Sequence, residues 1–204
     1  MEGGPSGGGG LFYFHLTHLL LTHGAGSNRN APLLVALANA FSGHAIEVTR
    51  YDLPYRQDRA HGPPRPGDAA RDREGLREQI LKIREKHPSQ IWLGGHSYGG
   101  RQASMLAAES PELADRLLLL SYPLHAPGKP DQLRTAHFPK LTMPVLFVHG
   151  SRDSFGTLDQ LRTATALIPA AVQLLEIERA GHDLGRDREA VAAKIALAFA
   201  KFDP

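Results

Sequence analysis

The chain has 204 residues, of which 42% are hydrophobic and 22% are charged, so it holds enough apolar material for one substantial core. The formal net charge is +2 and the pI is near 9.0. The basic residues are scattered among 21 acidic ones, with no run of five or six, which argues against a nucleic-acid-binding protein. Cysteine is absent, which excludes disulfides, thiolate metal sites and a cysteine nucleophile.

The N-terminal segment "MEGGPSGGGG", residues 1–10, has too few side chains to bury, and we expect a disordered tail there. The folded domain is expected over residues 11–204. Its first stretch, "LFYFHLTHLLLTH", lacks a preceding basic region and a following cleavage site. It is interpreted as strand material, and we expect a cytoplasmic protein that does not associate with membranes.

Short apolar runs then alternate with longer amphipathic runs. Asn30 and Asp68 are the expected N-caps of the first two helices, and the Pro- and Gly-rich residues 54–68 are expected to form a loop. Strands are predicted over 18–23, 45–53, 90–95, 116–124, 144–150 and 172–178, and helices over 31–41, 69–86, 98–110, 157–168 and 187–202. This alternation predicts a single α/β domain with a mostly parallel sheet and helices on both faces.

The motif "GHSYG" lies directly between a predicted strand and a predicted helix rich in small residues. A serine on such a strand-turn-helix junction is typical of a nucleophile elbow, in which Gly95 and Gly99 let the neighbouring backbone pass closely. The alternative is an ordinary glycine-rich turn, since the chain has 21 glycines. We take Ser97 as the candidate nucleophile.

A serine hydroxyl needs a base to remove its proton and an acid to orient that base. Asp153 follows one buried strand and His182 follows the next, and the chain order Ser, Asp, His is that of an α/β-hydrolase. Asp159 is a poorer acid because the following helix would carry it away, and Asp183 is adjacent to the base in sequence. We therefore predict Asp153 as the acid and His182 as the base.

The segment "THGAGSN" follows the first strong strand, where a tight loop can turn backbone amides toward the nucleophile. The predicted oxyanion donors are the amides of Ala25 and Tyr98, and the alternative for this segment is a plain strand-to-helix loop. His23 is expected to brace the loop, and His96 is expected to point away along the elbow. No HxxxH or HExxH pair is present, so we expect no metal and no cofactor.

Several stretches together are similar to a known family: "THGAG", "YDLPYR", "GGHSYGGRQAS", "SYPLHAPGKPDQLRTAHF", "VLFVHGSRDSFGT" and "GHDL". They resemble the small α/β-hydrolases of the dienelactone-hydrolase-like group, and within it the branch named after a subunit of the NSL chromatin complex and a testis-expressed protein. The resemblance implies the same roles for Ser97, Asp153 and His182. It departs at His96 and Tyr98, where relatives often carry Lys and Met.

Only about twenty residues separate Tyr122 from Pro144, too few for a helical cap domain, so the site is expected to be shallow and open. Candidate substrate-binding residues are Gly24, Tyr122, Pro123 and His125, although "YPLHAPGKP" is equally typical of a rigid surface loop.

The leading hypothesis is a cofactor-free serine hydrolase that acts on small carboxylic esters or thioesters. Arg101, in the first turn of the helix after the serine, is expected to pair with an acid of a neighbouring loop rather than to steer an anionic substrate. The expected partner is a small-molecule ester, with no nucleic acid, and the chain is expected to be a monomer or homodimer. The rival is a weakly active or inactive binding protein, since the chromatin subunit of the similar branch acts as a scaffold.

Overall fold

The computed structural model describes residues 17–86 and 90–202, so the tail predicted over residues 1–10 lies outside the described part of the chain. Six strands form one sheet in the order β2-β1-β3-β4-β5-β6, and every described strand pair is parallel. The strands are β1 Thr17–Thr22, β2 Ile46–Tyr51, β3 Gln90–His96, β4 Arg116–Leu120, β5 Val145–Gly150 and β6 Val172–Ile177. The predicted parallel α/β architecture is confirmed.

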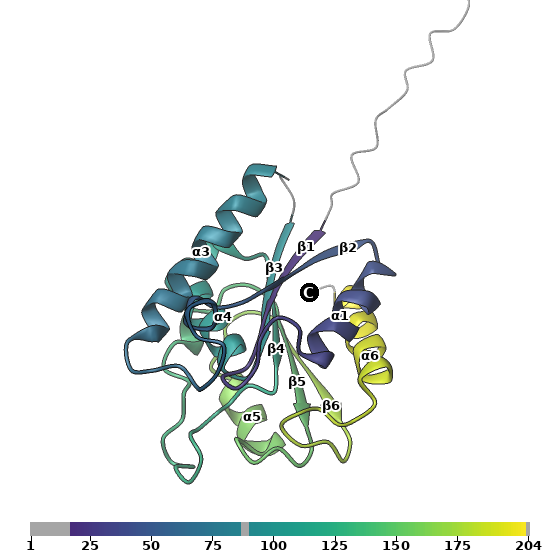
Figure 1. Ribbon diagram of the computed structural model, residues 1–204. Helices are drawn as coiled ribbons and strands as arrows, with labels where there is room; N and C mark the ends of the chain where they lie inside the picture. Colours follow the sequence, from purple (N-terminus) through teal and green to yellow (C-terminus); the bar gives the residue numbers. More distant parts are fainter. Residues whose placement is uncertain (1–16, 87–89, 203–204) are drawn as a thin grey trace, which may run out of the picture.

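Helices cover both faces of the sheet, with α1 and α6 on one side and α3, α4 and α5 on the other (Figure 1). The α-helices are α1 Pro32–Ser42, α2 Pro54–Asp58, α3 Asp68–Lys86, α4 Tyr98–Glu109, α5 Leu158–Thr165 and α6 Arg188–Lys201. Two short 3₁₀ helices, η1 Pro111–Leu113 and η2 Phe138–Lys140, flank β4 and the following segment.

Strand β4 shows why continuous apolar runs fit this architecture. Leu117 and Leu119 pack into the core on the α3 and α4 side, whereas Leu118 and Leu120 pack into the core on the α1 and α6 side. Because successive side chains of a strand point to opposite faces, a strand covered on both faces needs apolar residues at every position.

Four local predictions were wrong. The N-cap of α1 is Ala31, not Asn30, because the Asn30 side-chain oxygen accepts a hydrogen bond from Arg50 instead of capping the helix. Asp68 is the first residue of α3 rather than its cap, and it accepts hydrogen bonds from the Arg65 amide and the Arg59 guanidinium.

The third concerns the loop predicted over 54–68, whose first residues form the short helix α2, with Pro54 at its first position. Strand β4 also ends four residues earlier than expected, at Leu120. The reason is Ser121, whose φ of 46° turns the chain out of the extended conformation.

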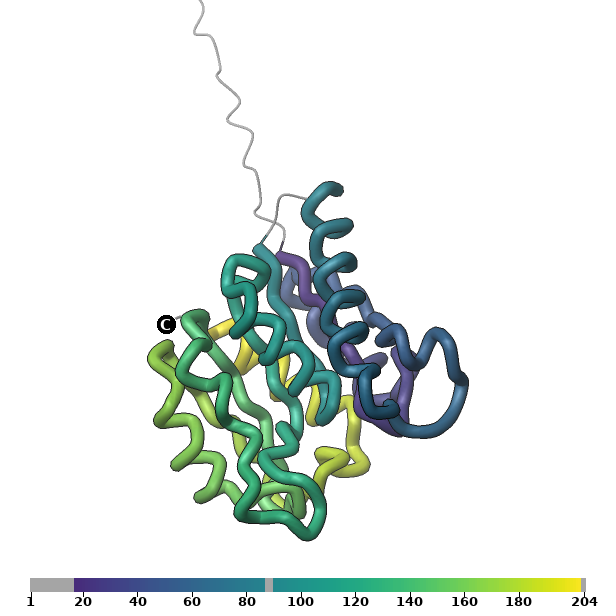
Figure 2. Tube along the Cα trace, turned by 90° about the vertical axis from the view of Figure 1, so that its left-hand side faces the viewer, coloured from purple at the N-terminus to yellow at the C-terminus, as the bar shows by residue number. Residues whose placement is uncertain are grey.

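The segment between β4 and β5 contains η2 as its only described regular element, which confirms the prediction that no cap domain covers the sheet. In Figure 2 this segment (teal to green) and the loop after α2 (blue) project beyond the layered core as separate loops. None of the described helices is both long and apolar enough to cross a membrane.

Candidate active site

Ser97 lies at the sharp turn between β3 and α4, with φ 51° and ψ −116°. L-residues rarely adopt this backbone conformation, and it persists where the surroundings hold it. The Ser97 amide donates to the Leu120 carbonyl at 2.8 Å, which ties the turn to the end of β4. A Cβ at Gly95 would lie 2.7 Å from backbone atoms of Gly99 and Gly100, so this close crossing requires glycine.

The three residues predicted from separate motifs meet at this turn. The Ser97 hydroxyl donates to His182 Nε2 over 2.7 Å. On the other side of the ring, His182 Nδ1 donates to the Asp153 carboxylate, at 2.8 Å to Oδ2 and 3.0 Å to Oδ1. This is the geometry in which a carboxylate fixes the imidazole tautomer that can accept a proton from serine.

The acid is held in a buried and ordered position. Burial alone would raise the pKa of Asp153, but hydrogen bonds from His182 and from the Phe155 amide outweigh it and hold that pKa below its usual value. His149, fully buried, donates from Nε2 to the Gly156 carbonyl and lies 3.8 Å from Asp153 Oδ2. The Phe155 ring stacks on His182, with centroids 4.1 Å apart. The Asp153 carboxylate is therefore ionised, and stacking against Phe155 fixes the position of the His182 ring.

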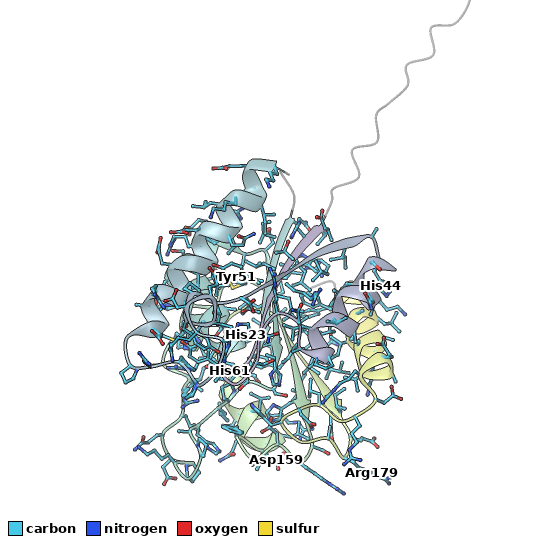
Figure 3. All side chains as sticks on the ribbon, viewed as in Figure 1. His23, His44, Tyr51, His61, Asp159 and Arg179 are labelled. Atoms are coloured by element: carbon cyan, nitrogen blue, oxygen red, sulfur yellow. The ribbon has the colours of Figure 1, made fainter. Side chains whose placement is uncertain are left out.

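The alternative acids lie elsewhere. Asp159 is on α5, where its side chain is 92% exposed and pairs with Arg162; Figure 3 labels it at the outer edge of the molecule. Asp183 pairs with Arg188 and accepts a hydrogen bond from the Gly185 amide. Neither carboxylate is bonded to His182.

The prediction that His96 points away from the site is wrong. Its ring lies beside that of His182, with centroids 5.4 Å apart, and its Nε2 donates to the His182 carbonyl at 2.9 Å. Burial lowers the pKa of His96 to about 4, so the ring is neutral near pH 7. His96 therefore holds the backbone of the base and does not compete with it for a proton.

The two predicted oxyanion donors come from the loop after β1 and from the start of α4. Tyr98 is the first residue of α4, so its amide has no partner within the helix. Neither this amide nor that of Ala25 donates a hydrogen bond to another residue in the described parts of the chain. Both residues line one cavity together with Ser97.

A set of buried side chains holds the loop that carries Ala25. The Tyr55 hydroxyl donates to the Ala25 carbonyl at 2.9 Å, and Arg56 donates to the same carbonyl at 3.0 Å. His23, whose position in the interior is labelled in Figure 3, donates from Nδ1 to the Gly24 carbonyl and accepts from the Leu53 amide. Burial lowers the pKa of His23, so the neutral ring serves as both donor and acceptor, as expected for a brace.

Asp72 of α3 connects the two sides of this arrangement. Its carboxylate is fully buried and accepts hydrogen bonds from the Tyr98 hydroxyl at 2.7 Å and from the Tyr55 amide at 3.0 Å. Burial, followed by the bond to Asp72, raises the pKa of Tyr98, so the phenol stays protonated and donates. The sequence gives no local signal for this bridge, because its members come from three helices.

A model of the alpha/beta hydrolase domain matches residues 15–198. The chain belongs to the alpha/beta hydrolase family. Three solved structures share its fold. An alpha-beta serine hydrolase homologue from Coxiella burnetii has a TM-score of 0.71 and 18% identity, over 89% of this chain and 84% of that one. A dienelactone hydrolase from Anabaena variabilis has a TM-score of 0.72 and 20% identity, over 92% of this chain and 87% of that one. Est1E from Butyrivibrio proteoclasticus has a TM-score of 0.70 and 16% identity, over 90% of this chain and 87% of that one.

The cavity of this hydrolase-family chain opens beside Ser97 and has a volume of about 490 Å³, within the range of small-molecule sites. It is lined by Gly24, Ala25, Gly26, Ser27, His96, Ser97, Tyr98, Arg101, Pro123, Pro127, Arg134, Phe155 and His182. Among the residues that the structure describes, no group of three or more His, Asp or Glu side chains could hold a metal ion.

Two of the four candidate substrate-binding residues, Gly24 and Pro123, line this cavity, and two do not. Tyr122 is fully buried against Phe138 and Phe147 in the core. His125 is also buried, with Nδ1 donating to the Ala126 carbonyl. Tyr122 packs against the aromatic core beneath the cavity, so it is corrected from a contact residue to a core residue.

Arg134 and Phe155 are cavity residues that the sequence interpretation missed. The only sequence signal for Phe155 was its place two residues after Asp153, in the loop that carries the acid. Arg134 had none, because it reaches the cavity from a long irregular loop. Arg101 was expected to pair with an acid, but no carboxylate within the described residues forms an ion pair with it.

Proposed function

We propose that this chain is a serine hydrolase that cleaves small carboxylic esters or thioesters through an acyl-enzyme. The observation that supports this most is the continuous path of hydrogen bonds from the buried Asp153 through His182 to Ser97, which lines an open cavity. A buried carboxylate, a partly exposed imidazole and a serine on a strained turn are the groups that acyl transfer requires.

In the acylation step, the Ser97 oxygen attacks the ester carbonyl carbon while His182 Nε2 takes the hydroxyl proton. The negative charge that develops on the carbonyl oxygen is stabilised by the amides of Ala25 and Tyr98, the latter at the positive end of α4. The protonated His182 then gives its proton to the leaving alcohol or thiol. Asp153 stabilises the imidazolium during this transfer.

In the deacylation step, water takes the place of the leaving group. His182 removes a proton from this water, which attacks the acyl carbon, and the Ser97 oxygen leaves with the proton that His182 returns. The stacked ring of Phe155 and the hydrogen bond from His96 keep the imidazole within reach of both oxygens. No cofactor takes part in this sequence of steps.

A fluorophosphonate probe tests the proposal, because it reacts with an activated serine. We expect the wild-type protein to be labelled and Ser97→Ala to remain unlabelled, with Ser151→Ala, in the turn after β5, labelled like the wild type. Equal labelling of wild type and Ser97→Ala would overturn the assignment. No labelling, no hydrolysis across a panel of short acyl esters and a co-purifying protein would favour the scaffold alternative.

Further parts of the proposal rest on the sequence motifs. We place the chain in the branch named after the NSL chromatin subunit and a testis-expressed protein, on the motifs around residues 121–138 and 145–157. We also propose that the domain spans residues 11–204 and acts in the cytoplasm as a monomer or homodimer on a small-molecule ester, without nucleic acid. Size-exclusion chromatography with light scattering tests the oligomeric state.

A further inference from the structure

Two guanidinium groups line the cavity beside Ser97, and no carboxylate lines it. Arg101 comes from the first turn of α4, and Arg134 comes from the loop between β4 and β5. The only other titratable side chains of the lining are His96, Tyr98 and His182, and none of these carries negative charge at neutral pH. The cavity wall is therefore positive and has no internal counter-ion.

Arg101, which is half-buried, differs from the buried Arg56 near the same site. Arg56 uses its guanidinium fully, donating to the carbonyls of Ser27, Arg59, Ala25 and Gly62. Arg101 Nε is buried with no hydrogen-bond partner among the described residues. A buried N–H group without an acceptor costs stability, so this side of the Arg101 guanidinium is left for a group bound in the cavity.

The hydroxyl of Tyr122 lies close to Arg101 and does not neutralise it. Burial raises the pKa of Tyr122, although the neighbouring guanidinium groups oppose this, so the phenol is uncharged at neutral pH. The hydroxyl donates its proton to the Arg134 carbonyl at 2.7 Å. The positive charge of Arg101 is thus left for a ligand in the cavity.

Arg134 is held at the cavity by its own backbone. Its amide donates to the Leu124 carbonyl at 2.8 Å, and its carbonyl accepts from Tyr122. Its guanidinium makes one long contact, 3.5 Å, with the Pro123 carbonyl. Burial, and after it the repulsion from the nearby Arg101, lowers the pKa of Arg134. Both residues line the same cavity.

The spacing from the nucleophile limits the size of the ligand. The Arg101 amide donates to the Ser97 carbonyl at 3.0 Å, so the two residues are one helical turn apart, about 6 Å along the axis. A negative group bound by Arg101 would lie a few bonds from an ester carbonyl held at Ser97. A planar guanidinium matches a carboxylate with two parallel hydrogen bonds.

We propose that the cavity selects esters whose short acyl chain carries a carboxylate, and that Arg101 and Arg134 bind this carboxylate while Ser97 attacks the ester carbonyl. This inference rests on the proposed hydrolase function and names its substrate class. It replaces the expected structural pairing of Arg101 by a specificity role.

The test compares monoethyl glutarate with ethyl 4-carbamoylbutanoate, which has the same shape but an amide in place of the carboxylate. Ethanol release gives kcat/KM for each. Because hydrogen bonds to charged groups contribute about 1.5–3 kcal/mol, we expect wild type to prefer the carboxylate about ten- to a hundredfold. Arg101→Met and Arg134→Met should each reduce this ratio about tenfold, mainly through KM, and Arg101→Lys should keep part of it.

Arg162→Met is the matched control, because Arg162 is an exposed arginine of α5 that pairs with Asp159. It should keep the wild-type ratio. An equal rate on both esters in the wild type, or an unchanged ratio in both Arg101→Met and Arg134→Met, would overturn the inference. If Arg101→Met does not fold, the ratios measured for Arg101→Lys and Arg134→Met decide the test.

A binding measurement separates this inference from the proposed function. Calorimetry of glutarate with Ser97→Ala requires no turnover, and we expect binding that Arg101→Met in the same background removes. Fluorophosphonate labelling without any preference for the anionic ester would contradict the inference alone. Glutarate binding without labelling of the wild type would contradict the hydrolase function and keep the anion site.

Discussion

On one side of the cavity, Ser97 and His182 stand on turns that follow β3 and β6, whereas on the other side Pro123 and Arg134 belong to the long segment between β4 and β5. The first side is fixed by close backbone crossings and a strained φ at Ser97. The second is fixed by a few hydrogen bonds, such as that from the Arg134 amide to the Leu124 carbonyl.

This difference suits the first side to catalysis and the second side to substrate recognition. Chemistry requires atoms held within fractions of an ångström, which sheet ends and helix starts provide. Recognition of a substrate group tolerates a loop, and loops vary without disturbing the core. We therefore expect substitutions on the first side to lower kcat and substitutions on the second side to raise KM.

The largest effect is expected from Asp153→Asn. The amide cannot fix the same tautomer of His182 or stabilise its protonated form, so kcat should fall by about two to four powers of ten while the melting temperature changes little. Steady-state kinetics and thermal unfolding check this. Asp159→Asn and Asp183→Asn are the controls and should stay near wild type. A near-normal rate in Asp153→Asn with loss of activity in a control would place the acid elsewhere.

Tyr55→Phe should have a smaller effect on catalysis, through the loop that carries Ala25. It removes the hydroxyl that donates to the Ala25 carbonyl, so one oxyanion donor loses its support while keeping its amide. Since deleting such a donor costs about a hundred- to a thousandfold in kcat, loosening it should cost about tenfold with little change in KM. Tyr51→Phe, at the β2 position labelled in Figure 3, is the matched control. If both variants kept wild-type kcat, Tyr55 would have no positioning role.

Tyr122→Phe disturbs only the recognition side. The lost hydrogen bond to the Arg134 carbonyl is worth about 1 kcal/mol, so KM for monoethyl glutarate should rise about fivefold with kcat unchanged. Urea unfolding should show a similar loss of about 1 kcal/mol in the free energy of unfolding. A fall in kcat with an unchanged KM would contradict the division between the two sides.

The last effect concerns the pH dependence of stability rather than catalysis, and it involves one histidine from each side. Burial lowers the pKa of His96 and of His137 from 6.5 to about 4 in each case. A group with a lowered folded pKa contributes stability above its unfolded pKa, and this stability is lost as pH falls from 6.5 toward 4. The free energy of unfolding should therefore decrease over that window. His137→Gln should make the decrease shallower, and an unchanged slope would contradict this account.

Sequence alone could predict the first side because each of its residues follows a strand. The carboxyl ends of parallel strands meet at one edge of the sheet, so motifs that end β3, β5 and β6 had to converge. The structure brings Ser97, Asp153 and His182 within hydrogen-bond distance, as the motifs suggested.

The second side could not be predicted in the same way. The inward position of Tyr122 and the position of Arg134 at the cavity depend on hydrogen bonds between residues 10 to 12 positions apart. The segment is irregular, so no sequence periodicity indicates which way its side chains point. The orientation of His96 was predicted wrongly for a related reason. Its partner is a carbonyl 86 residues away, and no local pattern contains that contact.

The most direct test of the central claim is detection of the acyl-enzyme itself. The protein is mixed with 4-nitrophenyl acetate, nitrophenolate is followed before the steady state, and samples quenched in acid are digested and analysed by mass spectrometry. The account predicts an initial burst close to one equivalent of nitrophenolate and an acetyl group on the peptide that contains Ser97, with both absent in Ser97→Ala. An acetyl group on His96 or His182 in place of Ser97, or a burst that persists in Ser97→Ala, would contradict it.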